Sequence, residues 1–243
     1  MNIAELKQGC TVLKLACPER VVFVLDMRCG NSRGEQFKLA ASTFVKMKSA
    51  MDARHEFALV AVCGDCPVWL CDFTRDASAF SDKVAALQAD HQASNAQFDL
   101  TSVLQLVHTN GVASALEPEI KEHLGHNPSF VLRLVLVYGQ SATVPLLDSN
   151  CPIVADLMAA RHFFLDAVFV HDKPTLDNCP QEIFDFLTSE LQTVNHSLSL
   201  FVETSVERKI GQLVMSLISH PLLRLSQSDQ QAWPTSLIHQ GEE

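Results

Sequence analysis

The chain lacks both a long uninterrupted apolar run and an excess of basic side chains. No apolar run reaches the roughly 18 residues of a membrane-spanning helix, and Glu5 and Lys7 stand in a start that has no signal-peptide core. The 18 Lys and Arg face 28 Asp and Glu, which gives a formal net charge of −10. Binding to nucleic acid phosphates needs a basic stripe, and the longest basic cluster is Lys46 with Lys48. These absences favour an intracellular protein that contacts neither membranes nor nucleic acid directly.

Length and composition indicate an ordinary folded protein. The 243 residues correspond to about one and a half domains of typical size, which fits one large domain with a tail or two small ones. An apolar content of 47% with 19% charged residues excludes wholesale disorder. A chain of this length buries enough surface to fold without disulfides or structural metals.

Cysteine is present eight times, but no disulfide or metal pattern accompanies it. The single CxxC pattern joins Cys63 to Cys66, whereas a structural zinc site takes four ligands and a second such pair is missing. No helix start follows Cys63, as a thioredoxin-like redox site requires. We therefore expect eight reduced thiols, no zinc and no cofactor.

Two hydrophobic periodicities alternate along the chain. Continuous apolar runs predict buried strands over residues 21–25, 57–62, 131–138, 163–171 and 197–202. Apolar residues spaced by three and four predict helices over 37–51, 76–87, 99–107, 152–161, 180–191 and 206–218, with 28–34 as a polar loop. Residues 68–70 follow the second strand after a short turn, which predicts a hairpin at one antiparallel edge. The alternation indicates an α/β doubly wound, mostly parallel sheet.

The loops after Leu25, Val137 and Val170 are the first places to look for function, because ligands of such sheets bind beyond the carboxyl ends of the strands. The first of these loops has neither a GxGxxG nor a GxxxxGK[ST] phosphate cradle.

Asp26 ends the first strand, where Asp-x-Ser-x-Ser sites hold Mg²⁺, but Arg28 and Gly30 occupy the two hydroxyl positions. Neither supplies an oxygen ligand, and Tyr138 stands where a second carboxylate is needed. We expect a degenerate metal site that binds no divalent cation, with Asp26 accepting hydrogen bonds from loop amides.

Catalytic patterns are also missing from the sequence. Ser141 follows Gly139 without completing the GxSxG elbow, and the pair His171 and Asp172 has no nucleophile to activate. His55 and Glu56 precede a strand, where we expect a surface pair. We predict no catalytic residue and no enzyme activity.

A set of short segments, in order, resembles a known family. They are CPERVV (17–22), HEFALV (55–60), WL (69–70), FDL (98–100), PSFVLRLVLVY (128–138), FFLD (163–166) and HPLLR (220–224). Together they resemble the von Willebrand A-like subunit of the BRISC and BRCA1-A deubiquitinase complexes, over most of the chain from residue 17 to about 227. The resemblance implies a Rossmann-like von Willebrand A domain at 19–204, an N-terminal segment at 1–18, and a C-terminal helix and partner-binding tail at 205–243.

The same resemblance implies a non-catalytic scaffold or adaptor. Cleavage of non-degradative ubiquitin chains belongs to a separate zinc metalloprotease of the JAMM class, which has its own MPN-type scaffold partner. This chain is expected to bind the UEV-like subunit known as brain and reproductive organ-expressed protein. The associated biology is DNA-damage signalling in the nucleus and deubiquitination in the cytoplasm.

The partner-binding residues that we expect are Pro221, Leu222, Leu223 and Arg224. They follow the last helix with two large apolar side chains where the chain leaves the core, and Arg224 offers planar donors to carboxylate or carbonyl groups. Two alternatives stay open. One is a metal-dependent, adhesion-type von Willebrand A domain, and the other is an α/β enzyme with a site around Asp26, Tyr138 and His171.

Overall fold

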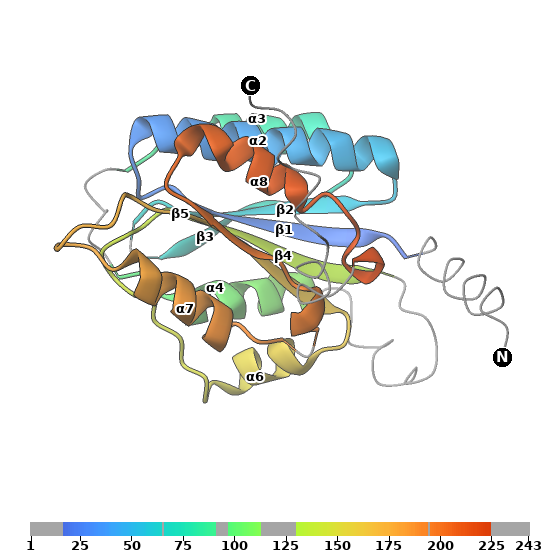
Figure 1. The fold of residues 1–243 in the computed structure, drawn as a ribbon. Coiled ribbons are helices and arrows are strands. Elements are labelled where there is room, and N and C mark those ends of the chain that lie inside the picture. Colours follow the sequence, from blue (N-terminus) through green and yellow to red (C-terminus); the bar gives the residue numbers. More distant parts are fainter. Residues whose placement is uncertain (1–16, 65, 91–96, 113–129, 194, 225–243) are drawn as a thin grey trace, which may run out of the picture.

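The computed structural model describes residues 17–64, 66–90, 97–112, 130–193 and 195–224. They form a six-stranded sheet in the order β3-β2-β1-β4-β5-β6 (Figure 1). The strands are β1 (Glu19–Asp26), β2 (Glu56–Val62), β3 (Pro67–Thr74), β4 (Val131–Tyr138), β5 (Phe163–Val170) and β6 (Phe201–Thr204). Only β3 is antiparallel to its neighbour within this sheet. The predicted sheet with one antiparallel edge hairpin is confirmed.

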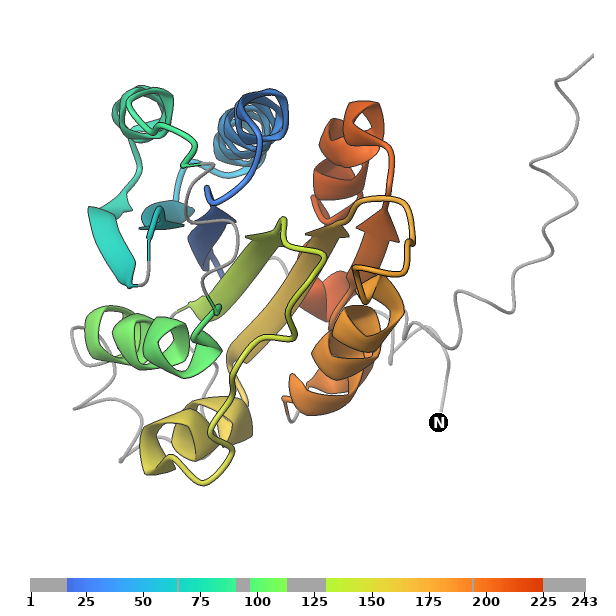
Figure 2. The ribbon, with the colours of Figure 1, turned by 90° about the vertical axis from the view of Figure 1, so that its left-hand side faces the viewer.

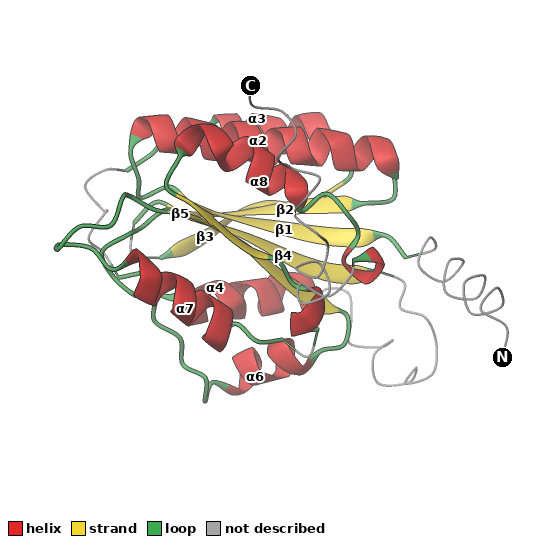
Figure 3. Ribbon diagram, in the orientation of Figure 1, coloured by secondary structure: helices red, strands yellow, loops and turns green. Residues whose placement is uncertain are grey.

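Helices cover both faces of the sheet. On one face lie α2 (Asn31–Met51), α3 (Ala77–Ala85) and α8 (Ile210–Ser216), and on the other α4 (Leu100–Val107), α6 (Pro152–Ala159) and α7 (Pro180–Glu190) (Figure 3). Alternate residues of the strands project to opposite faces, so each layer has its own apolar core. The view along the strands separates the two helix layers (Figure 2). Among the described residues, no helix is long and apolar enough to cross a membrane.

Most helix ends follow from local chemistry. The Asp76 carboxylate accepts hydrogen bonds from the amides of Ser78 and Ala79, and the Asp99 carboxylate accepts one from the amide of Ser102. Pro180 occupies the first turn of α7, where its missing N–H costs nothing. The predicted helix starts at these positions are confirmed.

The predicted loop over 28–34 is wrong in its second half, because α2 begins at Asn31. Gly34 is the residue that misleads, since glycine ordinarily disfavours a helix interior. A Cβ at this position would lie 3.0 Å from the Cβ of Ala89 and 3.2 Å from the Cε of Met27. Gly34 therefore serves the close approach of the neighbouring chain, and the helix continues through it.

A buried ion network joins the amino-terminal ends of three strands under α2 and α8. Glu19 of β1 pairs with Lys48 of α2 at 2.5 Å and with Arg133 of β4 at 2.9 Å. Arg133 also pairs with Asp166 of β5 at 2.6 Å, and Asp166 pairs with Arg224 at 2.7 Å. All five side chains are buried. Burial alone raises the pKa of both carboxyls, but the neighbouring cations outweigh it and hold the pKa of Glu19 and Asp166 below their ordinary values.

The network also fixes the end of α8. Its three cations exceed its two carboxylates, and backbone carbonyls after α8 accept the remaining donors. Lys48 donates to the carbonyl of Ile218 at 2.9 Å, Arg224 donates to that of Leu217 at 3.1 Å, and Arg133 also donates to the carbonyl of Leu217. The carboxyl end of a helix carries partial negative charge, so cations are favoured there. The helix expected within the 205–243 segment is therefore packed on the sheet through Ile210, Val214 and Leu217.

Two histidines line the network as neutral side chains. His55 is buried, contrary to the expected surface pair, and its Nδ1 accepts the amide N–H of Glu19 at 2.8 Å. His220 accepts the amide N–H of Leu222 at Nδ1, so its Nε2 carries the proton and donates to the carbonyl of Cys17 at 3.1 Å. Burial lowers the pKa of both imidazoles.

The last strand and the last helix are both shorter than predicted. For the strand, the ion network supplies the reason. The run predicted as a strand over 197–202 becomes a strand only at Phe201, and residues His196–Leu198 form a 3-10 turn. Here the carbonyl of Leu198 accepts from Arg224 and the amide of Leu200 donates to Asp166, so these backbone groups bind the network. The predicted helix over 206–218 is a 3-10 turn at Glu207–Lys209 followed by α8, and that over 152–161 ends at Ala159. Residues 1–16 and 225–243, parts of the expected flanking segments, lie outside the described residues.

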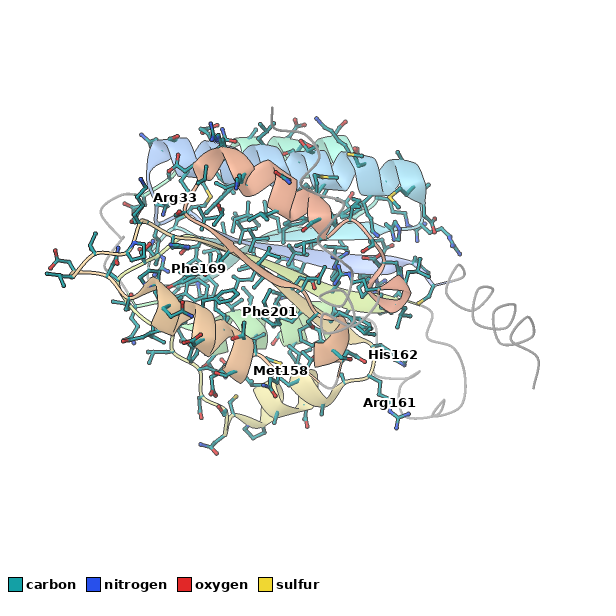
Figure 4. All side chains as sticks on the ribbon, in the orientation of Figure 1. Arg33, Met158, Arg161, His162, Phe169 and Phe201 are labelled. Carbon is teal, nitrogen blue, oxygen red and sulfur yellow. The ribbon has the colours of Figure 1, made fainter. Side chains whose placement is uncertain are left out.

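We expect Arg133→Met to lower the free energy of unfolding by about 3–5 kcal/mol, because it removes the guanidinium that pairs with the buried carboxylates of both Glu19 and Asp166. Denaturant unfolding followed by circular dichroism measures the change. Arg161→Met is the control, since Arg161 is exposed at the same end of the sheet (Figure 4), and its effect should stay within about 0.5 kcal/mol. Equal losses in both variants would contradict a structural role for the network.

Acid should lower the free energy of unfolding over two pH ranges, the first set by histidines and the second by carboxyl groups. The pKa of His55 and of His220 lies below the ordinary 6.5, so below that pH the unfolded chain takes up protons that the native protein resists. Glu19 and Asp166 add to this loss below their ordinary values of 4.5 and 3.8. Each such proton costs about 1.4 kcal/mol per pH unit. Denaturant midpoints should stay level from pH 8 to about 7 and fall between 6.5 and 4, and a midpoint that rises between 6.5 and 5 would contradict the assignment.

Candidate functional site

The candidate site lies at the carboxyl edge of the sheet, where the strand order reverses between β1 and β4. The loops after β1, β4 and β5 meet there around an open cavity of about 530 Å³. Its walls include Arg28, Gly30, Arg33, the stretch 139–142 and Asp172. The three loops selected from the sequence are thus brought together, at the end that faces the viewer in Figure 2.

Asp26 is neutralised by a cation of its own chain. The guanidinium of Arg28 donates from Nε to the Oδ1 of Asp26 at 2.8 Å, and both side chains are fully buried. The amide of Gly139 donates to the other carboxylate oxygen at 3.3 Å, and the amide of Arg28 donates to Oδ1 at 3.3 Å. The predicted role of Asp26 as an acceptor for loop amides is confirmed. Arg28 supplies the positive charge that Mg²⁺ supplies in an Asp-x-Ser-x-Ser site.

Aromatic rings fill the space beside this pair. The guanidinium of Arg28 lies 5.0 Å from the ring centre of Phe98, and the rings of Phe98 and Tyr138 are 5.0 Å apart. Tyr138 stacks on Phe169 at 5.8 Å and donates its hydroxyl to the carbonyl of Thr143 at 3.2 Å. Burial raises the pKa of the Tyr138 hydroxyl, so the phenol stays protonated. A buried aromatic side chain thus occupies the position where a metal site would place a second carboxylate.

Arg33 braces the three loops from the first turn of α2. It donates to the carbonyl of Gly139 at 2.8 Å and pairs with Asp172 at 2.7 Å. Its Nε lies 3.5 Å from Glu207, a residue that also accepts the hydroxyl of Ser32 at 2.8 Å. Figure 4 shows Arg33 at this edge, opposite Arg161 and His162. Sequence reasoning missed Arg33, because the segment that carries it was predicted to be a loop.

The residues present do not fit a divalent cation. Arg28 and Gly30 offer no oxygen, Tyr138 is turned to a backbone carbonyl, and the Asp26 carboxylate already carries a guanidinium. Within the described parts of the chain, no group of three or more His, Cys, Asp or Glu could hold a metal ion. The degenerate site predicted at Asp26, Arg28, Gly30 and Tyr138 is therefore an internal ion pair with an aromatic floor. This arrangement gives the metal-dependent adhesion alternative no support.

The residues of the alternative enzyme site each have structural partners. His171 lies 5.1 Å from the ring of Phe169, its Nδ1 contacts the carbonyl of Asp172 at 2.8 Å, and its Nε2 is 3.9 Å from Glu203. Asp172 is engaged by Arg33, and its amide donates to the hydroxyl of Ser141 at 2.8 Å. These contacts hold the loops after β4 and β5 together.

The segment expected to bind a partner lies at the opposite end of the sheet. Pro221 begins a 3-10 turn, Pro221–Leu223, and Leu222 packs against the small core cluster of Cys17, Val131 and Phe164. Arg224 donates as predicted to a carboxylate and to carbonyls, but these belong to Asp166, Leu198 and Leu217 of its own chain. The Arg224 guanidinium is thus engaged by groups of its own chain. Leu223 remains 51% exposed, and the partner role of the segment stays a prediction.

Comparison with curated proteins identifies relatives across most of the chain. A protein named BRISC and BRCA1-A complex member 1 from Xenopus laevis is 25% identical over 236 residues, which cover 88% of this chain and 67% of the relative. The protein of that name from Rattus norvegicus is 26% identical and covers 95% of this chain and 70% of its own length. This chain thus spans about two thirds of the length of these relatives. No family model matches. The resemblance seen in the sequence is confirmed.

Solved structures with the same architecture include a von Willebrand A domain. The SpRpn10 VWA domain superimposes with a TM-score of 0.55 at 15% identity, covering 83% of this chain and 97% of that domain. The TFIIH p34 N-terminal domain gives 0.56 at 14% identity, covering 82% and 97%. Proximal thread matrix protein 1 from the mussel byssus gives 0.57 at 12%, covering 84% and 48%. At these identities the likeness establishes the fold, which is the one predicted.

We expect no saturable binding of Mg²⁺ or Mn²⁺ at micromolar concentration, because Arg28 already neutralises Asp26. Isothermal titration calorimetry of the wild-type protein measures this directly. Arg28→Ser places a hydroxyl at the first of the two serine positions and removes the competing cation, so it is the variant in which any weak binding should appear. Micromolar binding to the wild type that disappears in Asp26→Ala would contradict the internal ion pair.

Proposed function

Because the chain is similar over 88% of its length to the BRISC and BRCA1-A complex member 1 proteins, we propose that it is a non-catalytic scaffold subunit of a deubiquitinase complex of that kind. This similarity to the complex-member proteins is the main support for a scaffold role. The internally neutralised sheet edge supports it, because a domain whose usual ligand position is closed by its own Arg28 and Tyr138 is better suited to hold partners than to perform chemistry. In this proposal the protein functions through the parts of its surface that bind other subunits.

In this proposal the reaction belongs to other subunits. A JAMM-class zinc metalloprotease, with its MPN-type scaffold partner, cleaves non-degradative ubiquitin chains, and this chain stabilises the assembly by binding the UEV-like subunit. Such complexes act in DNA-damage signalling in the nucleus and in deubiquitination in the cytoplasm, and we place the chain in both compartments. A catalytic role for the chain itself receives no specific support from the site geometry.

We assign the contact with the UEV-like subunit to the turn that carries Leu223. Pro221 and Arg224 are buried on either side of it, so the turn is held rigidly while Leu223 projects into solvent. A rigid exposed apolar side chain loses little conformational freedom on binding, which favours an anchor at this point. Arg224 is then a positioning residue, because its pair with Asp166 holds the turn that carries Leu223.

Affinity purification of the tagged full-length chain from cell extract tests the assignment to a complex. Mass spectrometry should recover a UEV-like subunit and a JAMM metalloprotease in amounts comparable to the bait. The same purified chain, assayed alone, should not cleave ubiquitin chains. Recovery of the chain without either subunit would contradict the scaffold role.

Variants of the turn test the contact itself. Leu223→Ala should reduce co-purification with the UEV-like subunit at least about tenfold, as expected for loss of one apolar anchor, with the melting temperature unchanged. Arg224→Ala should reduce both the co-purification and the melting temperature, because it removes the ion pair with Asp166 from the network. Leu176→Ala is the matched control, since Leu176 is exposed on the loop at the other end of the sheet. Binding of Leu223→Ala at the wild-type level would place the anchor elsewhere.

A further inference from the structure

The exposed face of α2 carries a row of large apolar side chains. Leu39 and Met51 are each 62% exposed, and Met47 is 50% exposed. Residues spaced by four form an inclined ridge on a helix, and Thr43 completes the ridge from Leu39 to Met51. Of the eight large apolar side chains that are exposed among the described residues, three belong to this ridge. Figure 2 shows the helix that carries it between α3 and α8.

The ridge lies on a cationic stretch of an acidic protein. Between Leu39 and Met51 the helix has no Asp or Glu, and its charged residues are Lys46 and Lys48. Lys48 is buried in the ion network, whereas Lys46 is exposed and follows Leu39 by seven residues, which places it on the same face. The whole chain, by contrast, has a formal net charge of −10. This face therefore fits an occupant that is both apolar and acidic.

The described chain ends close to this helix. Lys48 donates to the carbonyl of Ile218 at 2.9 Å, and Arg224 donates to the carbonyl of the residue before it, Leu217, at 3.1 Å. The last described residue is thus brought near the turn of α2 that carries Lys48. Residues 225–243 follow it in the sequence. A segment of that length reaches up to about 60 Å when extended, whereas Leu39 to Met51 takes about 18 Å of helix.

The composition of residues 225–243 meets both requirements of the α2 face. Their large apolar residues include Trp233, Leu237 and Ile238, and they contain acidic residues but no Lys or Arg. The other flanking segment, residues 1–16, has two Lys against one Glu, so its charge has the wrong sign. Charge complementarity therefore favours the C-terminal segment as the occupant.

We propose that residues 225–243 dock in cis on the exposed ridge of α2, with the indole of Trp233 against the thioethers of Met47 and Met51. Methionine adapts its shape to a neighbouring ring and makes favourable sulfur–aromatic contacts. Covalent attachment gives the segment a high effective concentration at the ridge, so a small contact area suffices. The docked segment covers an apolar face that would otherwise invite association. The inference does not rest on the proposed function, which uses the turn at Leu223.

Tryptophan fluorescence of the purified full-length chain tests the proposal, because Trp69 and Trp233 are its only tryptophans. Trp69→Phe leaves Trp233 as the single reporter. Its emission should be blue-shifted relative to the same chain in denaturant and shielded from acrylamide, and neither property should depend on protein concentration. If Trp69→Phe does not fold, the difference between the spectra of the wild type and of Trp233→Phe reports Trp233 instead.

Charges introduced on α2 test the location. Met51→Glu should lower the ratio of docked to free segment at least about tenfold, as expected from the loss of one buried apolar contact, and should shift the Trp233 emission to the red. Lys46→Glu should act in the same direction, because it repels the acidic segment. Leu176→Glu is the matched control, since it places the same charge at an exposed leucine on the loop after β5, and it should leave the emission unchanged.

Three results would overturn the proposal. In the first, acrylamide quenches Trp233 as strongly in the native chain as in denaturant. In the second, Trp233 is shielded but both α2 substitutions leave it so, which places the segment elsewhere. In the third, the signal depends on concentration and sedimentation velocity shows dimers, which makes a second copy the occupant. All these measurements use the chain alone, so they are independent of binding to the UEV-like subunit.

Discussion

The guanidinium of Arg133 lies fully buried at the centre of the ion network that joins the sheet to α2 and to the end of α8. It stands in the middle of three parallel strands and pairs with carboxylates from the strands on both sides, Glu19 and Asp166. A charge in such a place is costly unless every donor finds an acceptor. The fold therefore has to bring together residues that are far apart in sequence, including Lys48 and Arg224. Replacement of a whole buried ion network by apolar residues of similar volume often preserves stability, whereas removal of one partner is costly.

A buried ion pair also occupies the opposite, carboxyl edge of the sheet. Arg28 and Asp26 form a second buried guanidinium–carboxylate pair, at the position where α/β sheets ordinarily accept ligands. Arg33 then links the surrounding loops to α2 and to Glu207. The carboxylate at the end of β1 is thus satisfied internally, so the fold retains the shape of a ligand-binding domain while Asp26 is engaged by Arg28. This agrees with a scaffold, whose contacts are made by its surfaces.

The two ends differ in what they leave accessible. At the carboxyl edge the polar groups bind one another across the cavity, while at the amino end the ion network fixes a short turn and leaves Leu223 in solvent. Arg224 thereby links core and surface, since the guanidinium that completes the network also positions the turn. A change at Arg224 consequently affects the core network and the turn together, whereas a change at Leu223 affects the surface alone.

Local sequence patterns account for the alternation of strands and helices, the antiparallel edge, the capped starts of α3 and α4, and the lack of oxygen ligands in the side chains of Arg28 and Gly30. These features follow from local periodicity, from capping chemistry and from which atoms a side chain offers. The tertiary structure alone decided the partners of the charges. Arg133 and Asp166 interrupt otherwise apolar strands, a signal that complementary charges must meet. Nothing local to Arg224 or His55 indicates burial, and Gly34 belongs to a helix only because another segment approaches it. Such outcomes depend on contacts between distant residues, which a local pattern does not contain.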